Sequence, residues 1–555
     1  MGFAETLTAA HKCASRLWLR VDALWTAAQV SRCGSYSVAR LQAFDAYCRV
    51  TSRKRVVAVC VLTPLPSLVF PILLECIPLT APRLGWDASW NIWIRCTLTN
   101  TVLTTNFITQ ARQVLPDLEI ARWRIACVAV CTGASFAAVS ALIAALWRFP
   151  IPFAFVVTSV PFGCLVLFFF VILIGTKPFT QVQNLRKKLH QLCRVMMVQF
   201  TLITIYPVYS ALFMWFSSEQ QTIFLFTLPA LKLAMKNLMA KTFVGSDLED
   251  SIPEITVFSV EIFNSLYISA CLQMANSAKT TTFIVIAIDV VQSIVMGRGV
   301  LKRSIITLKP HQHQHAEKSE AVVRASVCES CRQLRFLRGN VHSDEDLAAL
   351  ALAPLCAQAS DCNGVDQKCL KQVFGTRGGN SIVPLSPIPC VHPSHQTSRP
   401  RDVRSLIIQQ TRATLFNCEY LVLVEYIECV IPIVYAIYTS TLFYLPNAAF
   451  YPRIKPMTPE DLHSVQKHLG VYIVLEVVSL LGLCLFLRLK LRFSALYLLA
   501  FVLETHMEMI QAKLFVWVMY SLTYGLEHAG SIRSFLSAVF SARTRLTLLP
   551  PLVWL

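Results

Sequence analysis

Charged residues are scarce in this chain. They make up 15% of its 555 positions, whereas soluble domains carry about 25%. Residues of the set AVILMFWYC make up 55%, and the mean hydropathy is +0.54. The apolar residues gather in blocks of roughly twenty, the length of helix that crosses about 30 Å of hydrocarbon. This pattern excludes an ordinary soluble domain and predicts an all-α integral membrane protein.

The signature motifs of common enzymes are also missing. The sequence contains no G-x-x-x-x-G-K-[ST], G-x-G-x-x-G, G-x-S-x-G or H-E-x-x-H. It contains no N-x-[ST] glycosylation acceptor and no cleavable signal pattern at its start. We therefore expect a protein that is not an enzyme, with no catalytic residues.

Basic residues outnumber acidic ones, which gives a formal net charge of +18. A nucleic-acid partner would account for such a surplus. Lys and Arg also gather in the cytoplasmic loops of membrane proteins, however, next to the ends of the spanning helices. Here they flank the apolar blocks, so we expect a lipid bilayer as the partner and no nucleic acid. The sequence does not say which membrane this is.

About eleven helices (ten to twelve) are predicted to span the membrane. The candidate spans are residues 56–80, 91–110, 125–147, 151–175, 195–216, 222–240, 255–275, 280–298, 420–445, 470–487 and 493–520. The last block is long enough for one tilted helix or two shorter elements. The basic cluster at 52–55 predicts a cytoplasmic N-terminus, and alternation then puts every strongly basic loop on the cytoplasmic side.

The spans divide the chain into five parts. These are a cytosolic N-terminal segment at 1–55, an eight-span part at 56–303, a large cytosolic loop at 304–415, a three-span part at 416–530 and a C-terminal tail at 531–555. In the first part, residues 17–25 predict an amphipathic helix, either at the membrane interface or on a small N-terminal domain. The loop should be mostly disordered, with a short helix near 343–355.

Ionisable residues inside the apolar blocks are the candidate site. A mid-span acid or lysine costs about 2.5–3.5 kcal/mol, so it usually faces a partner or a wet cavity. At 1.5 Å per residue, Glu261 lies between Lys232 and Lys236 in depth, and the two lysines share a helix face. The sequence predicts a Lys–Glu–Lys cluster between the sixth and seventh spans. It serves either structure or the handling of an ion, a proton or an anionic substrate.

The later spans carry acids with few basic residues nearby. Carboxylates without cations repel, so some of them must be protonated, solvated or bound to a cation. Such a set is typical of a proton- or cation-coupled carrier, and equally of a wet vestibule without transport. The candidate intramembrane polar site comprises Lys232, Glu261, Asp289, Glu425, Glu428, Glu476 and Glu504.

A C-x-x-C pair in the long loop is a candidate metal site. Cys328 and Cys331 have the spacing with which two thiolates grip one tetrahedral Zn²⁺. The stretch CVHPSH at 390–395 only half supplies the second pair that a zinc site needs. Free thiols are the default in a reducing cytosol, and zinc in the loop is the alternative.

Five stretches carry a resemblance. They are WRFPIPFAFVV at 147–157, LPALKLAMKNLMA at 228–240, LEDSIPEITVFSVEIFNSLYISACLQMA at 248–275, EYLVLVEYIECVIPIVYAIYTSTLFYLPNAAFYP at 419–452 and LAFVLETHMEMIQAKLFVWV at 499–518. In these stretches the chain resembles a family of oomycete multi-pass membrane proteins of unknown function. The resemblance implies kinship and a membrane setting, and it names no chemistry.

Two functions stay open at this point. The first is a transporter or channel-like protein for a proton, a cation or a small solute, with a path lined by the intramembrane acids and Lys232. The second is a non-transporting receptor or scaffold that acts on a cytosolic protein partner through the 304–415 loop. In that case the buried charges serve only the structure.

Overall fold

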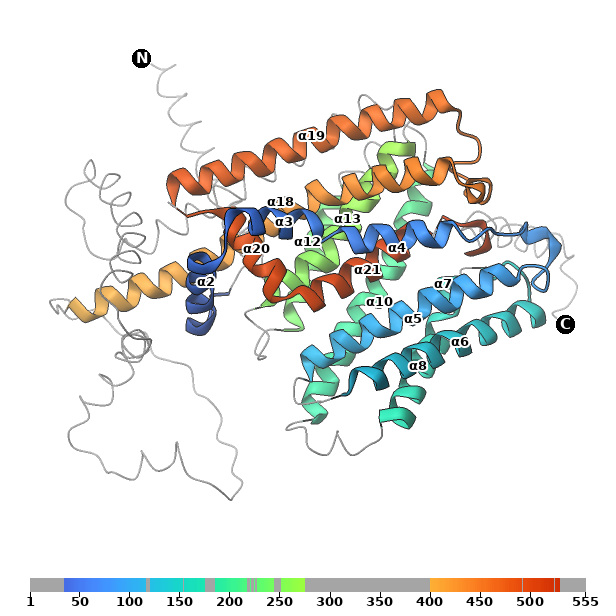
Figure 1. Ribbon diagram of the computed structural model, residues 1–555, viewed down its shortest axis with the longest axis horizontal. Helices are drawn as coiled ribbons and strands as arrows, with labels where there is room; N and C mark the ends of the chain where they lie inside the picture. The colour runs from blue at the N-terminus through green and yellow to red at the C-terminus, as the bar shows by residue number, and fades with distance from the viewer. Residues whose placement is uncertain are drawn as a thin grey trace, which may run out of the picture.

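The computed structural model describes residues 34–115, 120–152, 154–174, 185–216, 227–243, 251–274, 400–491, 493–523 and 525–529, and positions 220 and 224. Within these ranges the regular structure is helical, with no β-strand, as the apolar blocks predict (Figure 1). Four helical stretches there are long and apolar enough to cross a membrane: Arg53–Glu75, Arg122–Leu146, Arg412–Phe443 and Pro459–Leu489. They indicate a membrane-associated protein.

The helices carry the labels of Figure 1. The first part of the chain forms α2 (Val38–Val50), α3 (Arg53–Leu62), α4 (Leu65–Glu75), η2 (Pro82–Leu84), α5 (Trp90–Val114), α6 (Arg122–Leu146), α7 (Ala154–Val157), α8 (Ser159–Ile174), α10 (Leu185–Trp215), α12 (Leu228–Lys241) and α13 (Ile252–Met274). The second part forms α18 (Pro400–Phe443), η4 (Pro446–Phe450), α19 (Pro459–Lys490), α20 (Ala495–Thr505), α21 (Met507–Thr523) and η5 (Glu527–Ala529).

The first apolar block is broken at Pro64, between α3 and α4. Proline has no backbone N–H, so the carbonyl four residues earlier, that of Cys60, loses its partner in the helix. The hydroxyl of Tyr426 on α18 donates to this carbonyl at 2.7 Å, and the amide of Gln511 on α21 donates to the Thr63 carbonyl at 2.7 Å. Neighbouring helices thus supply hydrogen bonds to the backbone carbonyls at the break, as membrane helices require.

Helix α5 shows how a polar block forms a long helix against apolar neighbours. Four threonines, Thr97, Thr101, Thr105 and Thr109, each donate a hydrogen bond to the carbonyl four residues earlier. Their hydroxyls therefore need no partner outside the helix. Helix α6 packs closely on α5 at Gly133, where a Cβ atom would lie 2.6 Å from the Thr97 carbonyl oxygen.

Two element boundaries are new in the structure. The block 493–520 forms two shorter helices, one of the two predicted alternatives, because the chain leaves helical geometry at His506 between α20 and α21. Helix α18 begins at Pro400, so the end of the 304–415 segment is helical, whereas the sequence predicted a mostly disordered loop. Because the first residues of α18 carry mixed charges, hydropathy alone does not predict this part of the helix.

Helix α13 is the central element. Every residue from 251 to 269 is buried, and the helix packs against α12, α18 and α21 (Figure 1). The parts on either side of the 304–415 segment are packed into one body. Helix α18 contacts α4 and α13, α20 contacts α3, and α21 contacts α4 and α5.

Several predictions lie outside the described residues. They are the amphipathic helix at 17–25, the span at 280–298 with Asp289, the short helix near 343–355, the Cys328–Cys331 pair and the tail at 531–555.

Candidate functional site

Four ionisable side chains meet where α12, α13 and α18 pack together. The ammonium of Lys232 lies 2.8 Å from a Glu261 oxygen and 2.6 Å from a Glu428 oxygen. The ammonium of Lys236 contacts the other oxygen of Glu261. The predicted contact of Glu261 with both lysines is confirmed. Glu428 joins them as a fourth member, which the sequence did not predict. We call these four residues the Lys–Glu cluster.

Burial and charge balance define the Lys–Glu cluster. Glu261 is fully buried, and at most 7% of any of the other three residues is exposed. Lys236 also lies over the ring of Tyr420, 5.4 Å from its centroid, which adds a cation–π attraction. Two cations face two carboxylates, so the cluster is neutral when all four are charged. A matched set of this kind offsets the cost of taking the charges out of water.

The sequence predicted few basic residues near the acids of the later spans, and it did not predict the contact of Glu428 with Lys232. Helices α12 and α18 both pack on α13, and this arrangement brings Glu428 against Lys232. The two residues are 196 positions apart in the chain, and no local pattern links them.

Glu425 and Glu476 lie at the contact of α18 with α19. Both are buried, and the Ser479 hydroxyl donates to a Glu425 oxygen at 2.6 Å. Ser479 is three residues after Glu476 and shares its helix face, so both acids lie near the same stretch of α18. Both carboxylates also lie near the thiol of Cys429. The structure thus brings these two candidates together, away from the lysines of α12.

Glu504 lies apart from the other candidates. Its carboxylate contacts Arg55 and accepts a hydrogen bond from the Tyr47 hydroxyl at 2.8 Å. A quarter of its side chain is exposed, and 62% of that of Arg55. The sequence placed Glu504 in mid-span, but the break at His506 puts it at the end of α20, beside the start of α3. It is not a fully buried acid.

A second buried cluster, which the sequence analysis missed, surrounds Arg40 of α2. The guanidinium lies 2.5 Å from a Glu254 oxygen and 2.9 Å from a Glu419 oxygen. The Tyr36 hydroxyl contacts Glu419, and His506 lies 3.1 Å from Glu254. Burial opposes the charge of Arg40, yet the two carboxylates hold the pKa of its guanidinium above the usual value.

A signal for this second cluster was present in the sequence. Glu254 and Glu419 stand at the starts of the seventh and ninth predicted spans, both on the cytoplasmic side. Two acids at the same depth require a cation, and the segment before the first span supplies Arg40.

A third cluster is built around Glu75 at the end of α4. Arg95 of α5 donates to both its oxygens, at 2.5 and 3.1 Å, and the hydroxyls of Tyr451 and Tyr438 donate to one of them at 2.7 and 3.2 Å. Asn447 donates to the backbone carbonyls of Glu75 and Ile77 at 2.8 Å. Glu75 and Arg95 flank one short loop, so the depth argument used for Glu261 would have paired them.

No metal site is found in the part of the chain that the structure describes. There, no group of three or more His, Cys, Asp or Glu residues is arranged to hold an ion. The predicted zinc pair, Cys328 and Cys331, lies outside that part and stays a prediction.

Comparisons with known proteins complete the description of the site. Searches against family models, curated proteins and solved structures found no match. The resemblance to oomycete membrane proteins therefore stays a prediction, and any proposal on function depends on the site alone.

Proposed function

We propose that the protein is a multi-pass membrane transporter or channel-like protein that moves a proton, a cation or a small solute past ionisable groups in its core. One observation carries the proposal. Polar side chains occur along the whole length of helix α13, from Glu254 to Gln273, by way of Ser259, Glu261 and Asn264, and they lie on more than one face of the helix. At 1.5 Å per residue this stretch is roughly 28 Å long, close to the thickness of the hydrocarbon layer.

Several polar atoms on α13 have no hydrogen-bond partner in the part of the protein that the structure describes. They include Oγ1 of Thr256, Oδ1 of Asn264 and Oγ of Ser265, all buried. Buried polar groups are almost always hydrogen-bonded, to water where protein offers nothing. Water at these atoms would join the Lys–Glu cluster to the polar groups above and below it. Such a chain of water and titratable groups is what proton or cation movement requires.

The proposal includes about eleven spans with a cytoplasmic N-terminus and a cytosolic 304–415 loop. The contacts between chain segments support this topology. Asn447 donates to the Glu75 carbonyl, and His528 contacts the Thr80 carbonyl at 2.8 Å. These contacts join three segments that the topology puts on the non-cytoplasmic side. The Arg40 cluster joins three segments predicted at the cytoplasmic end, those of Arg40, Glu254 and Glu419. Protease should cut the 304–415 loop only after cells are permeabilised.

A receptor or scaffold is the second candidate, and the closed ion pairs favour it. The Lys–Glu cluster is neutral, and Glu75 is matched by Arg95. Such pairs fix helix positions without any transport. A protein of this kind would act on a cytosolic partner through the 304–415 loop.

Flux through proteoliposomes separates the two functions. We expect the wild-type protein to carry a pH- or cation-dependent flux, measured with a trapped pH-sensitive dye and a panel of cations. Glu425→Gln and Glu476→Gln keep the side-chain shape but remove a titratable group, so each should insert normally and lose flux. Glu460→Gln is the matched control, because Glu460 is an exposed acid at the start of α19. Wild-type liposomes without flux for any ion, beside Gln variants with altered melting, would favour the scaffold.

A further inference from the structure

The Arg40 cluster, which comprises Tyr36, Arg40, Glu254, Glu419 and His506, has one permanent cation for two acids. Arg40 forms ion pairs with Glu254 of α13 and Glu419 of α18, and at most 8% of any of these three residues is exposed. Among the described residues, His506 is the only other base that contacts either acid. An imidazole is mostly neutral at pH 7. Unlike the Lys–Glu cluster, the Arg40 cluster therefore lacks one positive charge.

The two carboxylates converge on a single nitrogen atom. Nη2 of Arg40 lies 2.5 Å from a Glu254 oxygen and 2.9 and 3.0 Å from the two Glu419 oxygens. That nitrogen carries two N–H groups, so it cannot serve three oxygens at once. The two carboxyl groups also lie within hydrogen-bonding reach of each other. Carboxylates this close repel when both are ionised, and one proton between them removes the repulsion.

One oxygen atom in the cluster lacks a hydrogen-bond donor. Oε2 of Glu254 is buried and accepts no hydrogen bond in the part of the protein that the structure describes. Buried polar atoms almost always have a partner. The buried Tyr36 hydroxyl already donates to Glu419. A proton on Glu419, shared with Glu254, would supply the missing donor.

The other charged side chains on the surrounding elements do not fill the deficit. Their partners are Arg55 for Glu504, the Ser259 hydroxyl for Lys513, the Tyr36 carbonyl for Arg412 and solvent for Glu508. Within the described residues, the charge that Glu254 and Glu419 lack is therefore left to a proton.

His506 gives the buried acids a route to water. Its Nε2 atom lies 3.1 Å from a Glu254 oxygen, and 26% of its side chain is exposed. It stands at the break between α20 and α21, where the helix does not enclose it. An imidazole can accept a proton at one ring nitrogen and release one from the other.

We propose that the Arg40 cluster is a proton-binding site, in which Glu254 and Glu419 share one proton that exchanges with water through His506. On uptake, the imidazole accepts a proton from water, and the proton on Nε2 passes to Glu254 and is shared with Glu419. The cluster gains one proton and one positive charge, so it becomes neutral. Release is the reverse. The site does not depend on transport, since a receptor can hold the same proton.

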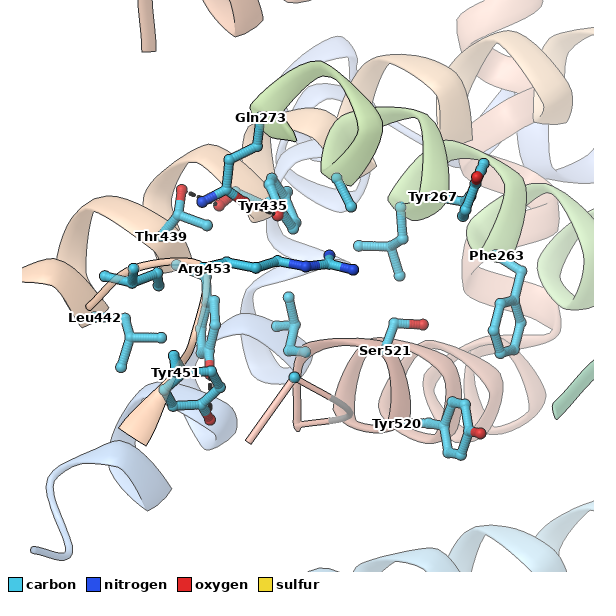
Figure 2. Close-up of a pocket in the computed structure, with 16 residues that line it drawn as sticks. Phe263, Tyr267, Gln273, Tyr435, Thr439, Leu442, Tyr451, Arg453, Tyr520 and Ser521 are labelled. Atoms are coloured by element: carbon cyan, nitrogen blue, oxygen red, sulfur yellow. Dashed lines mark hydrogen bonds between the residues drawn. The ribbon is translucent and has the colours of Figure 1, made fainter. Parts of the chain in front are cut away.

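A cavity of about 100 Å³ lies at the other end of α13 (Figure 2). A buried water needs roughly 10–15 Å³ of such space, so the cavity has room for several. Gln273 in the last turn of α13 lines it, whereas Glu254 stands in the first turn. In the proposed transporter, the proton site and the cavity would be the two ends of the polar stretch of α13. This link, unlike the site itself, rests on the proposed function.

The test is infrared difference spectroscopy of the full-length protein in detergent at pH 7, where exposed acids, with pKa values of about 4, are ionised. A protonated carboxyl group has a carbonyl stretch that a carboxylate lacks. Glu254→Gln and Glu419→Gln should each remove the same single band, because the acid that remains is balanced by Arg40. The double variant should remove no more. Glu460→Gln, at an exposed position on α19, is the control and should keep the band.

Exchange in D₂O tests the route. The band shifts as the proton is replaced by deuterium, and His506→Gln should keep the band but slow this shift by at least about tenfold. A positioned proton donor commonly speeds proton transfer by about 10²–10⁴-fold. His463→Gln, an exposed histidine, is the matched control and should exchange like wild type.

Several results would overturn the proposal. They are a wild-type spectrum without a band that depends on Glu419, a band that persists in Glu254→Gln, and unchanged exchange in His506→Gln. If the glutamine variants do not fold, Tyr36→Phe keeps the ring but removes the hydroxyl that donates to Glu419. It should shift the frequency of the band, and an unshifted band would count against the site. Flux plays no part in these readouts, so failure here leaves the proposed function standing.

Discussion

The ammonium of Lys513 on α21 donates a hydrogen bond to the Ser259 hydroxyl on α13 at 2.8 Å. Only 2% of Lys513 is exposed, and no carboxylate forms an ion pair with it within the described residues. The Ser259 hydroxyl in turn donates to the Ile255 carbonyl at 2.6 Å. Here a lysine is buried with a single neutral partner, in contrast to Lys232.

Lys513→Met should therefore keep or raise the stability of the protein. The change removes a buried amine, which costs about 1–3 kcal/mol when poorly compensated, and Ser259 keeps its bond to Ile255. The measurement is thermal unfolding in detergent. A clear fall in the unfolding temperature would mean that the ammonium has a stabilising partner beyond Ser259.

Lys232→Met, in contrast, should lower the stability of the protein. It leaves the carboxylates of Glu261 and Glu428 with only one nearby lysine, so we expect a loss of about 3–5 kcal/mol. Adding Glu261→Gln restores neutrality and should recover much of the loss. Double-mutant cycles should show coupling of Lys232 with Glu261 and with Glu428, and additivity with Glu476, which serves as the control. Additivity throughout would mean that the Lys–Glu cluster does not form.

Arg95→Gln should destabilise the protein much more than Glu504→Gln does. Arg95 is the cationic partner of the buried Glu75, so its loss should cost about 3–5 kcal/mol. Glu504 pairs with an exposed Arg55, and such pairs contribute less than about 1 kcal/mol. Unfolding by denaturant measures both variants. Equal losses would contradict the difference in burial on which this prediction depends.

His528 should make stability depend on pH. It lies after the last predicted span, its side chain is buried, and burial lowers the pKa of its imidazole below the usual value of about 6.5. The folded protein thus favours the neutral ring. This stabilisation is complete above about pH 6.5 and declines as the pH falls toward the lowered pKa.

The measurement is the unfolding temperature between pH 8 and pH 5. His528→Gln can still donate to the Thr80 carbonyl and should show a smaller fall toward acid pH than wild type. His463→Gln, at an exposed position, should keep the wild-type pH dependence. Identical pH dependence in wild type and His528→Gln would contradict the prediction.

The sequence predicted contacts that depend on short-range rules. Lys232 and Lys236 lie one turn apart, and Glu261 enters from the same side, so depth along two neighbouring helices was enough to pair them. The helical class followed in the same way, from the length of the apolar blocks. These features need only the rise of a helix and the cost of placing charge in lipid.

The remaining contacts depend on which helices are neighbours in space. Glu428 meets Lys232 only because α18 and α12 both pack on α13. Arg40 is buried only because α2 packs on α20, where its side chain reaches Glu254 of α13 and Glu419 of α18. The depth of Glu504 was misjudged because hydropathy does not show where a continuous apolar block bends. His506 ends α20 in the middle of such a block.

The distance of 196 residues between Lys232 and Glu428 has a consequence for biosynthesis. A ribosome adds about 5–20 residues per second, so Glu428 emerges roughly 10–40 s after Lys232. Glu261 emerges soon after the two lysines and contacts both in the final structure. For most of that interval it is the one acidic member of the cluster that has been made, and its single charge balances one of the two lysines. Glu261 is therefore the member of the cluster whose carboxylate is available to join α12 to α13 before α18 is made.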